Sequence, residues 1–83
     1  RVAELPEVGV DACDDYFAQM RQCVNSNLSP DERIAAAKEL RASSRIMLGN
    51  VKLKQSDARI ENTCKRMRAA AKRRYASKGC TTL

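Results

Sequence analysis

The four cysteines constrain this chain more than any other feature. They lie at Cys13, Cys23, Cys64 and Cys80, so that nine residues separate the first pair and fifteen separate the last. Zinc sites usually have two ligands two to four residues apart, and dithiol redox sites have C-x-x-C, and this sequence has neither spacing. The pattern therefore predicts two disulfide bonds, which small domains with thin cores use for stability.

Size and composition limit both the core and the chemistry. The chain has 83 residues, with one Phe, two Tyr, no Trp and no His. A single domain of this size buries a small share of its surface, so we expect the disulfides to matter for its stability. Without His the chain lacks the commonest general base and the commonest neutral metal ligand. We therefore predict no enzyme, no metal site, no cofactor and no small-molecule substrate.

Residues 1–10 are predicted to form an extended arm ahead of a helical domain of residues 11–83. The segment contains Pro6 and Gly9 and shows no helical period. Its apolar residues need a surface to pack on: Val2, Leu5, Val8 and Val10. They pack either along this domain's own helices or on a neighbouring copy of the chain, and the sequence leaves both open.

The first and second helices are predicted from caps and apolar periodicity. The first begins with Asp11 as N-cap and ends at residues 25–27. Its apolar face contains Cys13, Phe17, Met20 and Val24, with Tyr16 half-buried at the edge. A capping box of Ser29 and Glu32 begins the second helix, which runs to about Leu48, where Gly49 and Asn50 predict a stop. Its predicted apolar face is Ile34, Ala37, Leu40, Met47 and Leu48.

A third helix is predicted after a loop at residues 49–56. Ser56 caps this helix, which runs to about Lys78, and Gly79 follows its end. Its apolar stripe is Ile60, Cys64, Met67, Ala71 and Tyr75. The sequence thus predicts an all-α fold, a three-helix bundle stapled by two disulfides.

The heights of the cysteines along the helices predict how they pair. Short loops favour antiparallel packing of consecutive helices, so the first and third helices are expected to be parallel. Cys13 and Cys64 then lie level, while Cys80 overshoots Cys23 by about six residues, or about 9 Å. A turn after Gly79 can bring Cys80 back, so we predict Cys13–Cys64 and Cys23–Cys80. The nested alternative, Cys13–Cys80 with Cys23–Cys64, needs antiparallel first and third helices and stays open.

Two families resemble parts of this pattern. The run Val10-Asp11-Ala12-Cys13-Asp14-Asp15-Tyr16, with Cys23 and Cys64-x15-Cys80, resembles small exported bacterial proteins that read I-P-E-C-D-x-Y, C and C-x15-C around a helical middle. That resemblance implies a helical fold and a periplasmic or extracellular location, and implies no activity. The C-x9-C pair alone also resembles the coiled-coil-helix proteins of the mitochondrial intermembrane space, which would imply an assembly factor or subunit there.

The third helix concentrates the positive charge. Residues 62–83 contain no acid and seven basic residues, which exceeds the formal net charge of +6 of the whole chain. These basic residues are Lys65, Arg66, Arg68, Lys72, Arg73, Arg74 and Lys78. Such a helix can bind an anionic polymer or lie on an anionic membrane. The same residues equally suit a solvated face whose cations complement the helix dipole. Tyr75 is the only aromatic ring nearby, which disfavours nucleic acid.

The remaining carboxylates suggest no catalytic pair. Asp14 and Asp15 are neighbours on a helix and point about 100° apart, so they stabilise the helix N-terminus rather than act as acid and base. Two functions are left open. In the first, a non-catalytic structural or interaction protein docks on a protein partner, or on its own copies, through the arm or a face of the Ala-rich helices. In the second, the basic third helix binds anionic envelope lipid, polysaccharide or nucleic acid.

Overall fold

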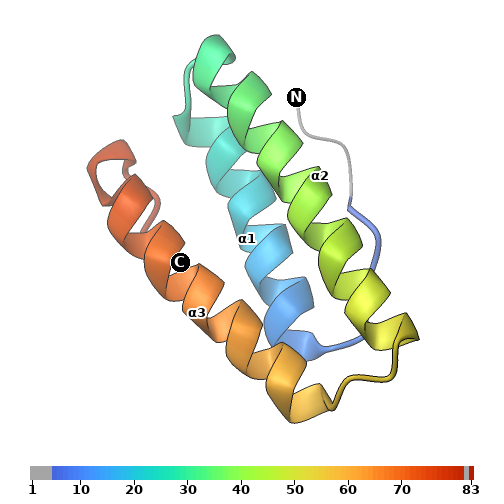
Figure 1. The fold of residues 1–83 in the computed structure, drawn as a ribbon. Helices are drawn as coiled ribbons and strands as arrows, with labels where there is room; N and C mark the ends of the chain where they lie inside the picture. The colour runs from blue at the N-terminus through green and yellow to red at the C-terminus, as the bar shows by residue number, and fades with distance from the viewer. Residues whose placement is uncertain (1–4, 82) are drawn as a thin grey trace.

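The structure is a computed structural model that describes residues 5–81 and 83. It contains α1 (Asp11–Asn27), α2 (Pro30–Lys52) and α3 (Asp57–Tyr75), followed by a short 3₁₀ turn, η1 (Ala76–Lys78). α1 and α2 form an antiparallel hairpin, and α3 returns parallel to α1 (Figure 1). The predicted all-α three-helix bundle is confirmed, and these residues contain no strand.

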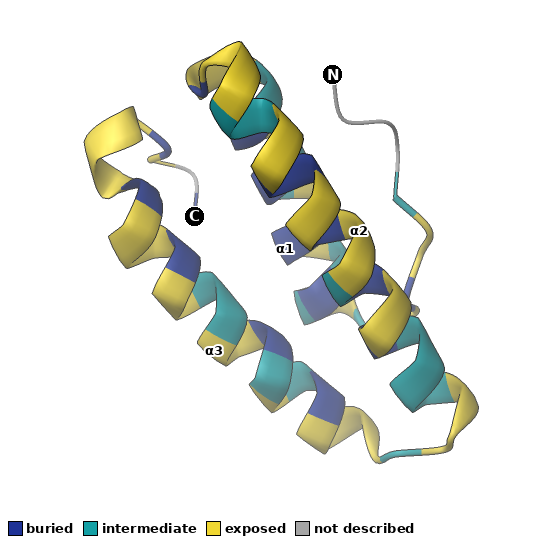
Figure 2. Ribbon diagram, turned by 45° about the horizontal axis from the view of Figure 1, so that its top comes forward, coloured by how far each residue is buried: buried dark blue, intermediate teal, exposed yellow. Residues whose placement is uncertain are grey.

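α1 is the central helix of the core. Its buried face packs against both other helices, and its members are Cys13, Tyr16, Phe17, Met20, Cys23 and Val24. α2 and α3 each pack along α1, whereas they contact each other only sparsely. Buried positions therefore follow the inner sides of the helices, and the outer sides of α2 and α3 are exposed (Figure 2). Tyr16, predicted to be half-buried, is buried, with 7% of its surface exposed.

Two disulfides tie α1 to the α3 end of the chain, in the pairing predicted from helix heights. Cys13 bonds Cys64 and Cys23 bonds Cys80, with Cα–Cα distances of 5.1 and 5.5 Å. The turn that brings Cys80 back depends on Gly79, which has a φ of 80°. A Cβ at this position would also lie 3.1 Å from Asn27 Nδ2. Glycine is therefore favoured here by the backbone conformation, and a larger residue would also have to displace the Asn27 side chain by a few tenths of an ångström.

α1 begins differently from the prediction. The N-cap is Val10, and its side chain makes no capping hydrogen bond, so the prediction of Asp11 as N-cap is wrong. The Asp14 carboxylate instead accepts hydrogen bonds from the backbone N–H groups of Val8 (2.7 Å) and Gly9 (3.1 Å). Asp14 therefore fixes the arm onto the first turn of α1.

α2 begins at the predicted capping box but runs beyond its predicted end. The prediction of a stop at residues 49 and 50 is wrong, because the helix continues to Lys52. Val51 lies one turn after Met47 and packs against the core, so continuing the helix buries more apolar surface. The helix ends where Lys54 adopts a φ of 60° and the Gln55 N–H donates to the Asn50 carbonyl (3.1 Å). This is the Schellman geometry, with lysine in the position that glycine usually takes.

The buried face of α2 is rotated from the predicted one. Ala37, Leu40 and Met47 are buried as expected, but Ile34 is 71% exposed, so its assignment to the core is wrong. Ala36 and Ser44 are buried in addition. Ser44 tolerates full burial because its hydroxyl donates to the Arg41 carbonyl in the preceding turn (3.0 Å).

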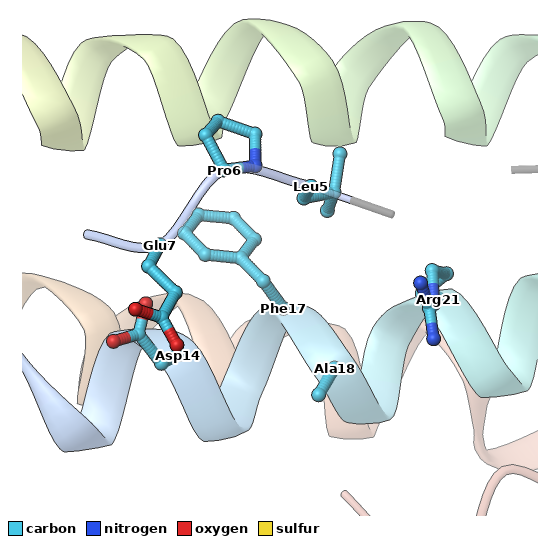
Figure 3. A pocket seen from close by; sticks show the side chains of 7 residues that line it. All are labelled: Leu5, Pro6, Glu7, Asp14, Phe17, Ala18 and Arg21. Carbon is cyan, nitrogen blue, oxygen red and sulfur yellow. The ribbon is translucent and has the colours of Figure 1, made fainter. Parts of the chain in front are cut away.

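The described part of the arm packs on this chain's own helices. Val8 belongs to the core, with 3% exposure, and Leu5 and Val10 pack against the core partly buried. The arm runs between α1 and α2, and the Phe17 ring points toward Pro6 (Figure 3). Pro6 and Phe17 also line a cavity of about 160 Å³ between the arm and α1. The fourth apolar residue predicted to dock, Val2, lies outside the described residues.

Candidate protein-docking groove

The outer side of α2 carries a second stripe, apolar except for Glu39, that the described chain does not cover. Its members alternate at spacings of four and three residues: Ala35, Glu39, Ala42, Ile46, Gly49 and Leu53. Ile46 is 60% exposed, and Leu53, which caps the helix end, is 77% exposed. This alternation keeps side chains on one face and is the pattern by which a helix packs against a second helix.

A groove separates α2 from α3 beside this stripe. Two adjoining cavities of about 220 and 240 Å³ share Ala36, Arg74 and Tyr75. Ala35 and Glu39 of the stripe line the groove on the α2 side. The α3 side contributes Met67, Ala70, Ala71, Arg74 and Tyr75, while Tyr16 and Met20 of α1 lie at its floor. Burial there raises the pKa of the Tyr16 hydroxyl above its ordinary value, so this group stays neutral at pH 7.

An ion pair crosses the groove near its middle. Arg74 Nη1 lies 3.0 Å from Glu39 Oε2, and the two side chains are 62% and 57% exposed. The Arg74 guanidinium also lies 5.3 Å from the centroid of the Tyr75 ring. Because both charged groups are largely solvated, the pair contributes little to stability and can open readily.

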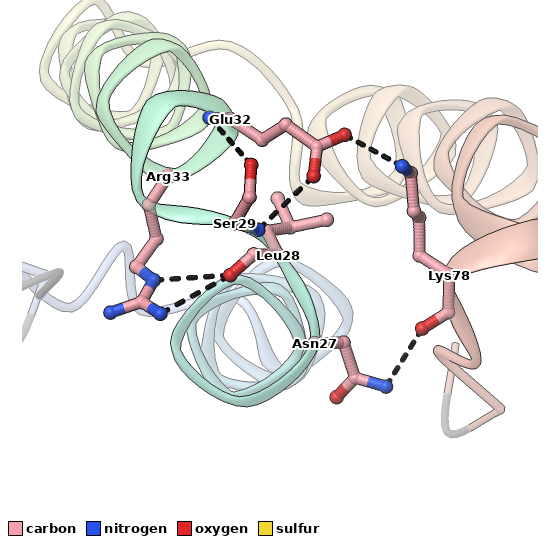
Figure 4. Close-up of polar contacts among 6 residues, drawn as sticks. All are labelled: Asn27, Leu28, Ser29, Glu32, Arg33 and Lys78. Carbon is pink, nitrogen blue, oxygen red and sulfur yellow. Dashed lines mark hydrogen bonds and ion pairs between the residues drawn. The ribbon is translucent and has the colours of Figure 1, made fainter.

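A second ion pair belongs to a capping network at the end of the groove (Figure 4). Glu32 Oε2 lies 2.7 Å from Lys78 Nζ, and Glu32 Oε1 accepts a hydrogen bond from the Ser29 N–H (3.0 Å). The bond from Lys78, followed by those from Ser29, lowers the pKa of Glu32 from 4.5 to about 2. Asn27 Nδ2 donates to the Lys78 carbonyl (2.8 Å). This end of the molecule is thus held by α1, α2 and η1 together.

The structure divides the seven basic residues predicted for anion binding. Three of them form ion pairs: Lys65 with Glu61 of the same helix at 3.0 Å, and Arg74 and Lys78 with glutamates of α2. Arg68 is half-buried. The other three are exposed and in no ion pair within the described part of the chain: Arg66, Lys72 and Arg73. The predicted set is therefore not one continuous cationic face.

Two rows of exposed cations flank the groove on its outer edges. On α2 a basic residue directly precedes three of the stripe residues, Glu39, Ile46 and Leu53. These basic residues are Lys38, Arg45 and Lys52. On α3 the row is Arg59, Arg66 and Arg73. Members of a row are seven residues apart, about 10.5 Å along a helix, and so share one face. The sequence prediction of an anion-binding set did not include Arg59, because it began at Lys65 and considered only cations beside the buried stripe of α3. The seven-residue spacing between Arg59 and Arg66 is the signal that could have identified it.

Other kinds of site lack support in residues 5–81 and 83. Those residues contain no cluster of His, Cys, Asp or Glu that could hold a metal ion. None of the described helices is both long and apolar enough to cross a bilayer.

Comparison with family models, with curated proteins and with solved structures finds no match to this chain. The resemblances drawn from the cysteine spacing therefore remain predictions. The fold defines the molecule as a small all-α bundle stapled by two disulfides. Disulfides of this kind persist in oxidising surroundings and indicate a compartment other than the cytosol.

Proposed function

We propose that this chain is a non-catalytic interaction protein that docks a protein partner on the outer stripe of α2. The observation that carries the proposal is the exposure of Ile46 (60%) and Leu53 (77%) at helix-packing spacing on a scaffold that two disulfides hold together. Burying such side chains against a partner helix is favourable, because apolar surface leaves water. The described arm already packs internally, so α2 replaces it as the docking surface.

The stripe has the properties of a helix–helix interface. Ala35 and Ala42 are small enough to let a second helix approach closely, and Ile46 and Leu53 supply larger side chains at the other end. The opposite face of α2 is occupied by α1, so the stripe plays no part in this chain's own core. A solvated helix needs no such stripe, and we therefore assign it to a partner.

The compartment we propose is the periplasm or the extracellular space of a bacterium. Its support is the pair of disulfides together with the resemblance of the cysteine pattern to small exported bacterial proteins. The mitochondrial intermembrane space is the weaker alternative, since the spacing between Cys64 and Cys80 departs from a second C-x9-C.

Site-specific photo-crosslinking in the source cells tests the docking surface. A photoreactive amino acid replaces Ile46 in one strain and Ile34 in a control strain, because both isoleucines are exposed on α2 but lie on different faces. We expect a discrete cross-linked protein from position 46 and none from position 34. A product of twice 9.2 kDa would support docking on another copy of this chain. Equal cross-linking at both positions, or none at position 46, would remove the proposal.

Polyanion binding is the second candidate, and the row of Arg59, Arg66 and Arg73 favours it. All three are exposed, stand about 10.5 Å apart and form no ion pair with another described residue. Heparin chromatography tests this with two variants of equal charge: Arg59, Arg66 and Arg73 to Gln, and a scattered set of exposed cations outside the described ion pairs, Arg41, Lys54 and Lys72 to Gln. If the row binds, the first variant elutes at much lower salt. Equal shifts would show that net charge alone is responsible.

A further inference from the structure

We propose that the groove between α2 and α3 is the empty fourth position of a four-helix bundle, and that an amphipathic partner helix with acidic residues on both flanks fills it. This inference rests on the proposed function, because it takes the α2 stripe as one wall of the docking site. The other side of the docking site is α3, the partner helix is acidic, and the partner is a protein other than a second copy of this chain.

The packing of the three helices leaves this position open. α1 packs against both α2 and α3, while those two contact each other only sparsely. Two helices in this relation occupy diagonal corners of a four-helix bundle, with α1 at the corner between them. The remaining corner lies opposite α1, where the cavities of about 220 and 240 Å³ lie between α2 and α3.

Both walls of the groove have the spacing of a helix–helix interface. The α3 wall repeats at four, three and four residues through Thr63, Met67, Ala70 and Arg74. The α2 wall, where Ala35 and Glu39 line the cavities, continues with the same spacing through Ala42 and Ile46 beyond them. Ala70 on α3 and Ala35 and Ala42 on α2 leave space between the larger residues of each wall for the side chains of an incoming helix.

The charges on the rims specify an acidic partner. The rims are the outer edges of the groove, where the two rows of cations lie. When helices pack side by side, the residues that flank the apolar contact pair with oppositely charged residues of the neighbouring helix. Here these flanking residues are basic in three successive repeats on each wall: Lys38, Arg45 and Lys52, and Arg59, Arg66 and Arg73. All six are exposed, and none is in an ion pair with a described residue. An incoming helix thus meets two cationic rows, and glutamate or aspartate on both of its flanks satisfies them.

A second copy of this chain does not fit the same groove. Its α2 or α3 would bring rows of cations against the cations of the rims, and like charges oppose that arrangement. Its α1 is acidic at Asp11 and Asp15, but the apolar face of α1 is already buried against α2 and α3. The partner is therefore a different protein.

The ion pair between Arg74 and Glu39 connects the two walls, and an acidic partner can replace it. It spans the two walls at 3.0 Å, and both side chains remain more than half exposed. A carboxylate on the incoming helix can take the place of Glu39 at Arg74. Opening the groove therefore breaks no buried contact.

Two peptides test the partner's chemistry on the intact, oxidised protein. Each is an acetylated, amidated helix of about three heptads, with Leu and Ala at the seam positions and either Glu or Lys at the flanking positions. Binding is measured by fluorescence anisotropy at 150 mM salt, roughly physiological ionic strength. We expect the Glu peptide to bind at least about tenfold more tightly than the Lys peptide, and the difference to narrow as salt rises.

The variants Ile46→Lys and Ile34→Lys locate the contact. Both change an exposed isoleucine of α2 by the same charge, so neither should lower the melting temperature. Ile46→Lys should weaken Glu-peptide binding about tenfold or more even though its added charge attracts the peptide, and Ile34→Lys should not weaken it. Equal losses in the two variants would overturn the groove as the binding site.

The remaining outcomes separate this inference from the proposed function. Equal affinity for both peptides would overturn the acidic partner. Glu-peptide binding that Ile46→Lys leaves intact but that heparin competes away would identify a polyanion surface instead. If neither peptide binds while position 46 still cross-links to a protein in cells, the docking surface stands and the four-helix inference falls. Loss of that cross-link would overturn both.

Discussion

Removing the Cys23–Cys80 disulfide measures how far this bundle depends on its staples. With Cys13–Cys64 intact, the shortest path between Cys23 and Cys80 runs through that bond and spans about 26 residues, worth roughly 3.5 kcal/mol on the chain-entropy model. A domain of 83 residues has a free energy of unfolding of about 4–12 kcal/mol. We therefore expect the Cys23→Ala/Cys80→Ala variant to lose about 30% or more of its free energy of unfolding.

The reverse variant separates chain entropy from packing. The shortcut path has the same length when Cys23–Cys80 is kept and Cys13–Cys64 is removed, so the entropic loss is equal. Cys13 and Cys64 are both 0% exposed, whereas Cys23 and Cys80 are 3% and 6% exposed. Cys13→Ala/Cys64→Ala should therefore cost as much or slightly more, because both variants leave a cavity in the core and the one at Cys13 and Cys64 is fully enclosed.

Urea denaturation followed by circular dichroism at pH 7 gives both free energies. The melting temperature of the Cys23→Ala/Cys80→Ala variant should fall by about 15 °C or more, at about 4–8 °C per kcal/mol for a domain of this size. If either variant lost less than about 1 kcal/mol of its free energy of unfolding, the disulfides would not be a main source of the bundle's stability.

Three further predictions follow from local geometry. Lowering the pH should remove a contribution of Glu32: its folded pKa of about 2 lies below the ordinary 4.5, so the contribution is complete above pH 4.5 and disappears as pH falls toward 2. The stability of Lys78→Met should vary less than that of wild type across this window in acid titrations, and parallel curves would contradict the assignment. Gly79→Ala should destabilise by about 1 kcal/mol or more in thermal melts, because φ is 80° and the added Cβ meets Asn27; an unchanged melting temperature would show that the turn relaxes. Asp14→Ala should free the arm and speed hydrogen exchange at the Val8 and Gly9 amides, while Asp15→Ala, whose carboxylate lies one position away, should leave both amides protected.

Local signals predicted much of the fold. The capping box at Ser29 and Glu32 and the glycine at position 79 each do what their local chemistry requires. Counting residues along helices joined by short loops was sufficient to pair Cys13 with Cys64 and Cys23 with Cys80. These features depend on residues close in sequence or on helix rise, which are the quantities a sequence contains.

The errors arise where tertiary packing overrides a local signal. Gly49 and Asn50 are helix-breaking residues, yet the burial of Val51 carries α2 past them. Ile34 looks like a core residue by type, but the face of α2 is set by contact with α1, which favours Ala36 and Ser44. An apolar residue identifies a buried position only when the direction of its neighbour is known.

The groove was invisible in the sequence for a related reason. Periodicity finds the dominant apolar stripe of each helix, and the second stripe of α2 is weak because it contains Glu39, Gly49 and two alanines. Its meaning depends on the sparse contact between α2 and α3, which no local pattern encodes. The basic rows on its rims likewise acquire a common role only when the two helices are placed side by side.

Mapping the bound acidic peptide by NMR shows whether it lies in the groove between α2 and α3. Backbone amide shifts are recorded for the ¹⁵N-labelled oxidised protein as the Glu peptide is added. We expect the largest changes at the wall positions, with little change at Ile34 and Arg41; these positions are Ala35, Glu39, Ala42 and Ile46 of α2 and Thr63, Met67, Ala70 and Arg74 of α3. Changes confined to the outer edge of α3 around Arg59, Arg66 and Arg73, with residues 35–46 unmoved, would contradict this prediction.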